Sequence, residues 1–92
     1  MEARFEWDPR KAAGNLAKHK VSFTEAIAVF ADPLGRIIDD PRHSGTEGRY
    51  VLLGCSDKKR LLAVMYTERG ETIRVISARK ATPRERKSYE ET

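Results

Sequence analysis

Three runs of strand-forming residues follow one another closely in the second half of the chain, and they constrain the fold more than any other feature. The runs are Arg49–Cys55, Leu61–Thr67 and Glu71–Ala78, each rich in apolar, β-branched or aromatic side chains. Only Ser56–Lys59 and Glu68–Gly70 separate them, and both connections have the length of a hairpin turn. Because so short a connection joins antiparallel neighbours, the sequence predicts an antiparallel sheet.

Helix-start signals lie before and after these strands. Asp8 precedes a proline, which suits the N-cap and the first position of a helix. Ser22–Glu25 and Thr82–Glu85 have the capping-box spacing, in which a hydroxyl and a carboxylate three residues apart accept from each other's backbone N–H groups. The predicted helices span Pro9–Lys20, Ser22–Ala31 and Pro83–Glu91.

Two short strands, Arg4–Trp7 and Arg36–Ile38, complete the predicted elements, and the polar segment Asp39–Gly48 is expected to be a mobile loop. A chain of 92 residues makes one domain, 1–92, and buries only roughly 60–65% of the surface that its unfolded form exposes. The expected fold is α+β, with two N-terminal helices and a C-terminal helix packed on a small antiparallel sheet. We expect the helices to gather on one face and to leave the opposite face for a ligand.

The last predicted strand carries two arginines, Arg74 and Arg79. In a regular strand, residues an odd number of positions apart point to opposite faces. Alternation therefore predicts one arginine on each face of the sheet, although it does not decide which face is the core.

Positive charge concentrates where this strand meets the last helix. The chain has 18 Lys and Arg against 14 Asp and Glu, a formal net charge of +4, which suggests a nucleic-acid partner without proving it. Cationic side chains at the junction of a sheet edge and a helix start are well placed to hold phosphate. A nucleic-acid backbone is therefore the expected ligand. The cluster consists of Arg74, Arg79, Lys80, Arg84, Arg86 and Lys87.

Other features of the sequence narrow the class of protein. The single cysteine, Cys55, has no partner for an internal disulfide and lies in an apolar run, which favours a buried thiol in a reducing, cytoplasmic compartment. The apolar runs are too short to span a bilayer and the N-terminus lacks a signal-peptide core, so no membrane role is expected. His19 and His43 lack companions at metal-ligand spacing, so we expect neither metal nor cofactor.

Two blocks of short motifs, one in each half of the chain, resemble the BrnT family of bacterial toxins. Each motif is short, but their joint order over nearly the whole chain, from Phe5 to about Glu90, is specific. The first block is Phe5-Glu-Trp-Asp-Pro9, Asn15-Leu-Ala-Lys-His19 and Val21-Ser-Phe-Thr-Glu-Ala26. The second is Gly48-Arg-Tyr50, Val64-Met-Tyr-Thr67 and Arg74-Val-Ile-Ser-Ala-Arg79, followed by Glu85, Arg86 and Tyr89.

The resemblance implies a RelE-like fold and a ribonuclease toxin of a type II toxin–antitoxin module, which cuts RNA and halts translation. It also implies neutralisation by a ribbon-helix-helix antitoxin of the BrnA type, with promoter DNA contacted only indirectly, through that antitoxin. One position departs from the family: Lys20 replaces the glycine expected after the Lys-His pair. Since glycine there would supply a left-handed C-cap, the turn that presents His19 is expected to differ.

RNA cleavage without a metal needs a base for the 2′-hydroxyl, positive charge on the phosphate and a proton for the 5′-oxygen, and it leaves a 2′,3′-cyclic phosphate. We expect Arg79 and Arg74 to neutralise the phosphate, with Lys18 and Arg49 as further candidates. His19 or Tyr89 would transfer the proton. This hypothesis requires the guanidinium groups to converge on one concave surface. The expected RNA-binding residues are Lys80, Arg84 and Arg86.

Each candidate also has a purely structural interpretation. Arg79 would form a salt bridge to a glutamate such as Glu85, and Tyr89 would dock the last helix on the sheet. Lys18 and His19 would complement the dipole of their helix, Arg49 would be a solvated strand end, and Asn15 would be a structural residue. Two other functions remain open: a non-catalytic nucleic-acid-binding module and a protein-interaction domain whose basic face docks an acidic partner.

Overall fold

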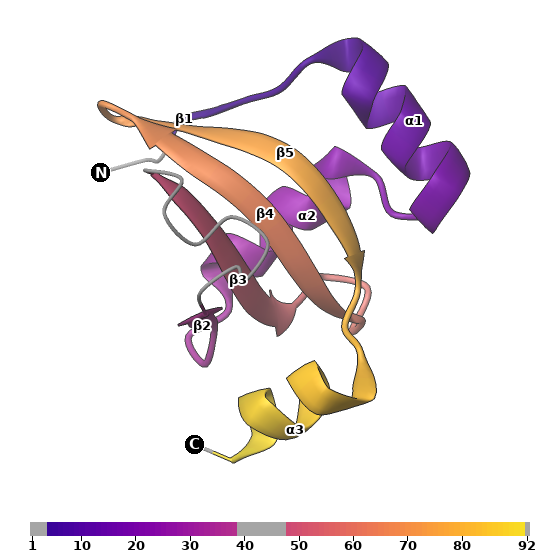
Figure 1. The fold of residues 1–92 in the computed structure, drawn as a ribbon, viewed down its shortest axis with the longest axis vertical. Coiled ribbons are helices and arrows are strands. Elements are labelled where there is room, and N and C mark those ends of the chain that lie inside the picture. The colour runs from indigo at the N-terminus through magenta and orange to yellow at the C-terminus, as the bar shows by residue number, and fades with distance from the viewer. Residues whose placement is uncertain (1–3, 39–47, 92) are drawn as a thin grey trace.

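The computed structural model describes residues 4–38 and 48–91 (Figure 1). The expected loop Asp39–Gly48 therefore lies outside the described residues except for Gly48, and so does His43. The elements are, in order, β1 (Arg4–Glu6), α1 (Pro9–His19), α2 (Phe23–Ala28), the 3-10 turn η1 (Val29–Ala31), β2 (Arg36–Ile38), β3 (Arg49–Cys55), β4 (Leu61–Arg69), β5 (Thr72–Lys80) and α3 (Pro83–Glu90).

Most predicted bounds are confirmed within one or two residues, because the signals that set them are local. Asp8 accepts a hydrogen bond from the backbone N–H of Arg10 at 2.8 Å and caps α1. Thr82 and Glu85 form the full capping box at the start of α3. The predicted second helix is divided, since regular α-helix ends at Ala28 and continues only as η1.

The five strands form one sheet in the order β1-β5-β4-β3-β2. The pairs β2–β3, β3–β4 and β4–β5 are antiparallel, as the short turns predicted for the last three strands. The pair β1–β5 is parallel, so the sheet is mixed and not wholly antiparallel. Most of the chain lies between these two strands, and no hairpin turn forces them to run in opposite directions.

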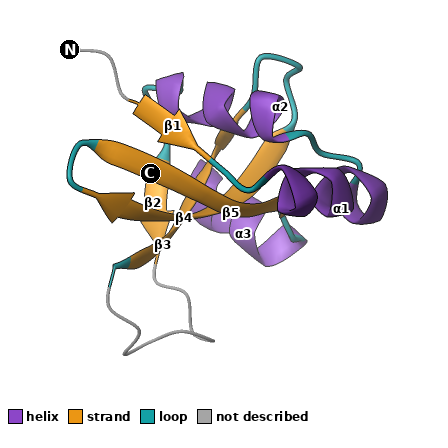
Figure 2. Ribbon diagram, turned by 90° about the horizontal axis from the view of Figure 1, so that it is seen from above, coloured by secondary structure: helices purple, strands orange, loops and turns teal. Residues whose placement is uncertain are grey.

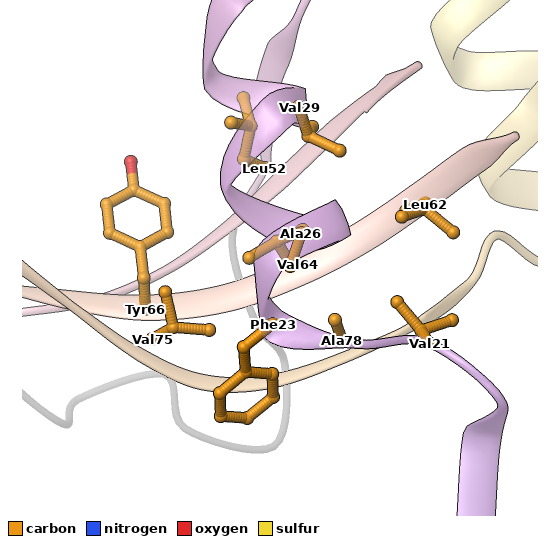
Figure 3. Packing of buried hydrophobic residues seen from close by; sticks show 10 residues of the cluster. All are labelled: Val21, Phe23, Ala26, Val29, Leu52, Leu62, Val64, Tyr66, Val75 and Ala78. Atoms are coloured by element: carbon orange, nitrogen blue, oxygen red, sulfur yellow. The ribbon is translucent and has the colours of Figure 1, made fainter. Parts of the chain in front are cut away.

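One face of the sheet carries the main core, which α2 and η1 cover (Figure 3). Ala12 of α1 also packs against it. Phe23, Ala26 and Val29 recur at helical spacing along α2 and η1 and are almost completely buried. Each large apolar side chain buried there contributes roughly 1.5–3 kcal/mol. The strands supply the other side of this core through Leu52, Leu62, Val64, Tyr66, Val75 and Ala78.

The last helix, α3, lies on the opposite face, so the expectation that all helices share one face is wrong (Figure 2). Strand β3 explains the difference: Leu52 points to the main core, whereas Val51 and Leu53 point the other way and are also buried. An apolar strand buried on both faces needs a cover on each. Tyr89 of α3 provides it, packing against the cluster of Val51, Leu53 and Ala63.

A β-bulge interrupts the pairing of β4 with β5. Met65 of β4 pairs with Ser77. The next residue of β4, Tyr66, pairs with Val75, which leaves Ile76 without a partner in β4. An extra residue of this kind shifts the side-chain alternation of its strand by one position. Residues of β5 on the two sides of Ile76 therefore depart from strict alternation.

Because of this bulge, Arg74 and Arg79 point to the same face, and the prediction of one arginine on each face is wrong. Arg79 lies opposite Ala63, a member of the cluster beneath α3. Arg74 lies opposite Thr67, two residues along β4 from Met65, which packs on that same cluster. Both guanidinium groups thus lie on the face away from the main core.

The structure also differs from what we expected at Cys55 and at Lys20. Cys55 is exposed at the end of β3 and not buried, since the strand ends there and the turn to β4 begins. Lys20 takes the left-handed conformation itself, with φ 61° and ψ 30°, and its N–H donates to the Leu16 carbonyl at 3.0 Å. The helix therefore ends with the geometry that a glycine would have supplied.

Candidate active site

The sheet face away from the main core is lined with arginines. Arg49 of β3 lies opposite Thr67 of β4, which in turn lies opposite Arg74 of β5, so the two arginines flank one residue in a row across three strands. Three expected site residues, Arg49, Arg74 and Arg79, thus share this face, which we call the arginine face. The register and alternation of the strands place on it Arg4, Arg36, Arg49, Arg69, Arg74 and Arg79.

A hollow of about 410 Å³ opens between α1 and this face of β5. We call it the α1–β5 hollow. It brings together three of the expected site residues, Lys18 and His19 from α1 and Arg79 from β5. Cations and an imidazole therefore meet in one concave, solvent-reachable place. The remaining lining residues are Lys11, Gly14, Asn15, Met65, Ile76 and Ser77.

Asn15 holds α1 against the edge of β5. Its amide nitrogen donates to the carbonyls of Ala78 and Val21, both at 2.8 Å, and its amide oxygen accepts from the Ala78 N–H at 3.0 Å. The side chain is buried, and it satisfies backbone groups that an edge strand would otherwise leave unpaired. This confirms the structural interpretation of Asn15 and explains how Lys18 and His19 are placed beside β5.

Arg79 also binds Glu85 of α3. Two guanidinium nitrogens donate to the two carboxylate oxygens at 2.6 and 3.0 Å, the bidentate geometry of a strong ion pair. The hydrogen bond from Arg79 lowers the pKa of the Glu85 carboxyl despite its partial burial. The contact proposed as the structural alternative is thus present, and it orients a guanidinium that also lines the α1–β5 hollow.

The other expected arginines do not line this hollow. Arg74 pairs with Glu6 of β1 at 3.2 Å, where both side chains are partly exposed, and Arg49 is exposed at the start of β3. The expectation that the guanidinium groups converge on one concave spot is therefore wrong, because only Arg79 of the three lines the hollow. Arg74 and Arg49 share its face but lie outside the hollow's lining.

Tyr89 donates a hydrogen bond of 2.6 Å to the carboxylate of Asp32, which also accepts from the Cys55 N–H at 2.8 Å. This bond, together with burial, raises the pKa of the Tyr89 phenol well above its ordinary value. The phenol is therefore held protonated against an acceptor. These contacts belong to the docking interpretation of Tyr89, and the residue is not among those lining the α1–β5 hollow.

The three expected RNA-binding residues divide between two places. Arg84 is exposed on the first turn of α3. Lys80 and Arg86 line a second hollow of about 290 Å³, together with Lys59, Arg60, Leu61 and Ala81. Arg86 also lies 3.9 Å from Glu90, one turn further along its exposed helix.

Sequence reasoning missed Lys11 as a lining residue of the α1–β5 hollow. The signal was present, because Lys11, Asn15 and Lys18 follow one another at helical spacing and share one side of α1. It also missed the pairing of Glu25 with Arg60, which joins α2 to the turn before β4. Nothing local relates those two residues, since they are 35 positions apart.

Within residues 4–38 and 48–91, no three His, Cys, Asp or Glu side chains come together as metal ligands. Over the same part of the chain, no helix has the length and apolar character needed to cross a bilayer.

Comparisons with known proteins agree on one family. The family model described as "Ribonuclease toxin, BrnT, of type II toxin-antitoxin system" matches residues 7–85. The crystal structure of the ribonuclease toxin BrnT of Brucella abortus superposes with a TM-score of 0.69 and 21% sequence identity, covering 88% of this chain and 99% of that one. At that identity, the superposition shows a shared fold. Among curated proteins, none matches the chain.

Proposed function

Because the chain belongs to the BrnT family of ribonuclease toxins of type II toxin–antitoxin systems, we propose that it is an endoribonuclease that cleaves RNA in the bacterial cytoplasm and so inhibits translation. The observation that carries this proposal is the α1–β5 hollow, in which Lys18, His19 and Arg79 meet. Positive charge and a group able to accept and donate protons near neutral pH are the requirements of this chemistry.

The reaction proceeds by attack of the RNA's own 2′-hydroxyl on the adjacent phosphorus. The 2′-oxygen loses its proton and bonds to phosphorus, the bond from phosphorus to the 5′-oxygen breaks, and that oxygen gains a proton. The products are a 2′,3′-cyclic phosphate and a 5′-hydroxyl. The imidazole of His19 lines the hollow and is the group that we propose to move the proton.

Arg79 and Lys18 stabilise the negative charge that grows on the phosphate oxygens. A guanidinium already oriented by Glu85 needs little reorganisation when the transition state forms. Since these side chains supply the positive charge, we propose that cleavage requires no metal ion. Arg74 and Arg49, on the same face outside the hollow, hold the flanking RNA backbone.

The experiment is RNA cleavage by purified protein in EDTA, followed by analysis of the product ends. We expect cleavage to persist in EDTA and to leave cyclic phosphate ends. Arg79→Ala and His19→Ala each lower kcat by about 10²–10³-fold while circular dichroism shows the fold intact. Lys87→Ala, an exposed cation on α3 outside both hollows, is the matched control. Unmodified 3′-hydroxyl ends would contradict the mechanism.

A second candidate function is a non-catalytic RNA- or DNA-binding module. The observation in its favour is that Arg74 and Arg79 each bind a carboxylate, Glu6 and Glu85. The same purified protein separates the two functions, because binding without cleavage supports the module. A protein-interaction domain would instead bind no RNA even at low salt.

The type II family implies an antitoxin partner, and we propose a BrnA-like ribbon-helix-helix protein that forms a hetero-oligomer with this chain. Promoter DNA would be contacted only indirectly, through the antitoxin. The arginine face supports this proposal, since an acidic inhibitor segment complements the same cations that attract RNA. Co-expression with the product of the neighbouring gene tests it: we expect a stable complex without ribonuclease activity, and two separate proteins would contradict it.

A further inference from the structure

The second hollow is lined by residues of the turn before β4 and of the segment that runs from the end of β5 into α3. Figure 1 shows these segments at the same end of the sheet. Four of its six lining residues are cations, Lys59, Arg60, Lys80 and Arg86. No acidic side chain is among the lining residues. A hollow with this lining attracts anions.

The four cations differ in how they are held. Arg60 is fixed, because its guanidinium binds Glu25 and donates to the Lys20 carbonyl at 3.0 Å. In contrast, no carboxylate of residues 4–38 or 48–91 forms an ion pair with Lys59 or Lys80. Two exposed ammonium groups therefore face the hollow with their charge uncompensated at short range.

The second hollow is next to the proposed active site along the chain and lies at the end of the sheet. Arg79 and Lys80 are consecutive in β5, about 3.8 Å apart at their Cα atoms, and they point to opposite faces. Arg79 lines the α1–β5 hollow, whereas Lys80 lies opposite the buried Leu62 and lines the second hollow. A chain of phosphates that leaves the first hollow at the end of β5 reaches the second by turning around the sheet end.

We propose that the second hollow binds a backbone phosphate of the substrate RNA, outside the scissile one, with Lys59 and Lys80 as its ligands. This inference rests on the proposed function and names the substrate as single-stranded RNA. A single strand can turn around the end of a β-strand, whereas a duplex is too stiff to bend over so short a path. Lys59 and Lys80 are binding residues that take no part in bond breaking.

The test is the salt dependence of RNA binding to the whole protein. The probe is a fully 2′-O-methylated RNA of about 12 nucleotides, within the site sizes usual for single-strand binders, because it keeps its phosphates but has no attacking hydroxyl. The variant is Lys59→Gln/Lys80→Gln. The matched control, Arg10→Gln/Lys58→Gln, removes the same charge from α1 and from the same turn at exposed positions outside both hollows.

We expect the double variant to bind roughly 5-fold more weakly at ~0.1 M salt, and its slope of log K against log salt to be smaller by about 0.7, the value for one phosphate contact with a single strand. We expect the control to change affinity less than about two-fold, since its charges are solvated and screened. A duplex of the same sequence should not distinguish the two variants.

Equal effects of variant and control, or no effect of either, would overturn the inference, as would a wild-type protein that does not bind the probe. Cleavage of unmethylated RNA is measured separately. If the wild type cleaves RNA but the double variant binds the probe as tightly as the wild type, the inference about the second hollow is wrong and the proposed ribonuclease function stands. If binding depends on Lys59 and Lys80 but no cleavage occurs, the inference stands and the proposed ribonuclease function is wrong.

Discussion

Asn15 and Ala78, 63 positions apart in the chain, bond to each other as two paired strands would. The amide of Asn15 donates to the Ala78 carbonyl and accepts from the Ala78 N–H, so that α1 closes the part of the β5 edge that the short β1 does not reach. This pairing sets the position of the whole α1–β5 hollow, because Lys18 and His19 follow Asn15 on the same helix.

Replacing Asn15 should therefore cost both stability and activity. Asn15→Ala leaves a buried N–H and two buried carbonyls without their partner, and we expect a loss of about 2–4 kcal/mol in the free energy of unfolding. Urea denaturation measures it. Ala17→Gly, at an exposed position of α1, is the control, with about 1 kcal/mol expected. A loss no larger than the control's would show that water replaces the side chain.

Tyr89→Phe separates docking from proton transfer. The variant keeps the ring on its cluster but loses the bond to Asp32, so we expect stability to fall by about 1.5–3 kcal/mol, as for hydrogen bonds to charged groups. We expect kcat for RNA cleavage at a temperature where the variant is folded to stay within about two-fold of the wild type. A large drop in kcat with the fold intact would place the phenol in the reaction.

Gly54 and Gly14 should respond oppositely to alanine. A Cβ at Gly54 would lie 2.8 Å from a methyl carbon of Val29 and 3.3 Å from the Asp32 carboxylate, so Gly54→Ala should destabilise by about 1–3 kcal/mol. A Cβ at Gly14 meets no atom within 4 Å, and alanine there favours the helix by roughly 0.5–1 kcal/mol. Thermal unfolding of the two variants checks the opposite signs.

The ion pair of Glu25 with Arg60 should make the free energy of unfolding depend on pH in the acidic range. The hydrogen bond from Arg60 lowers the pKa of the Glu25 carboxyl below its ordinary value and outweighs the opposite effect of burial. Folding therefore gains stability from this group above about the unfolded pKa and loses it as the pH falls through the lowered folded value. The stability difference between wild type and Glu25→Gln should shrink over that acidic range.

Removing only Arg60 is expected to be worse than removing the charge of Glu25. Arg60→Ala leaves a carboxylate that is almost completely buried without its counter-ion, at a cost of about 3–5 kcal/mol at neutral pH. Urea denaturation at several pH values measures both variants. If the free energies of unfolding of the wild type and Glu25→Gln differ by the same amount at neutral and at acidic pH, the role of the pair is contradicted.

Lys20→Gly should stabilise the protein. Lys20 has a left-handed conformation that costs a residue with a Cβ about 1–2 kcal/mol, partly offset by the extra freedom of glycine in the unfolded chain. We expect a net gain of about 0.5–1 kcal/mol, a rise in Tm of several degrees for a domain of this size. The hydrogen bond from the Arg60 guanidinium to the Lys20 carbonyl uses only the backbone of residue 20 and is kept. A lower Tm would show that the lysine side chain contributes more than this strain.

The sequence by itself determined the identity and order of the helices and strands, because caps, turns and side-chain periodicity act within a few residues of each other. Only the tertiary structure decided that β1 pairs in parallel with β5, and that a bulge at Ile76 turns Arg74 and Arg79 to one face. It also decided that Asn15, Lys18 and His19 close a hollow against that strand. These features depend on contacts between residues far apart in the chain, where one extra residue in a strand reverses every side chain beyond it.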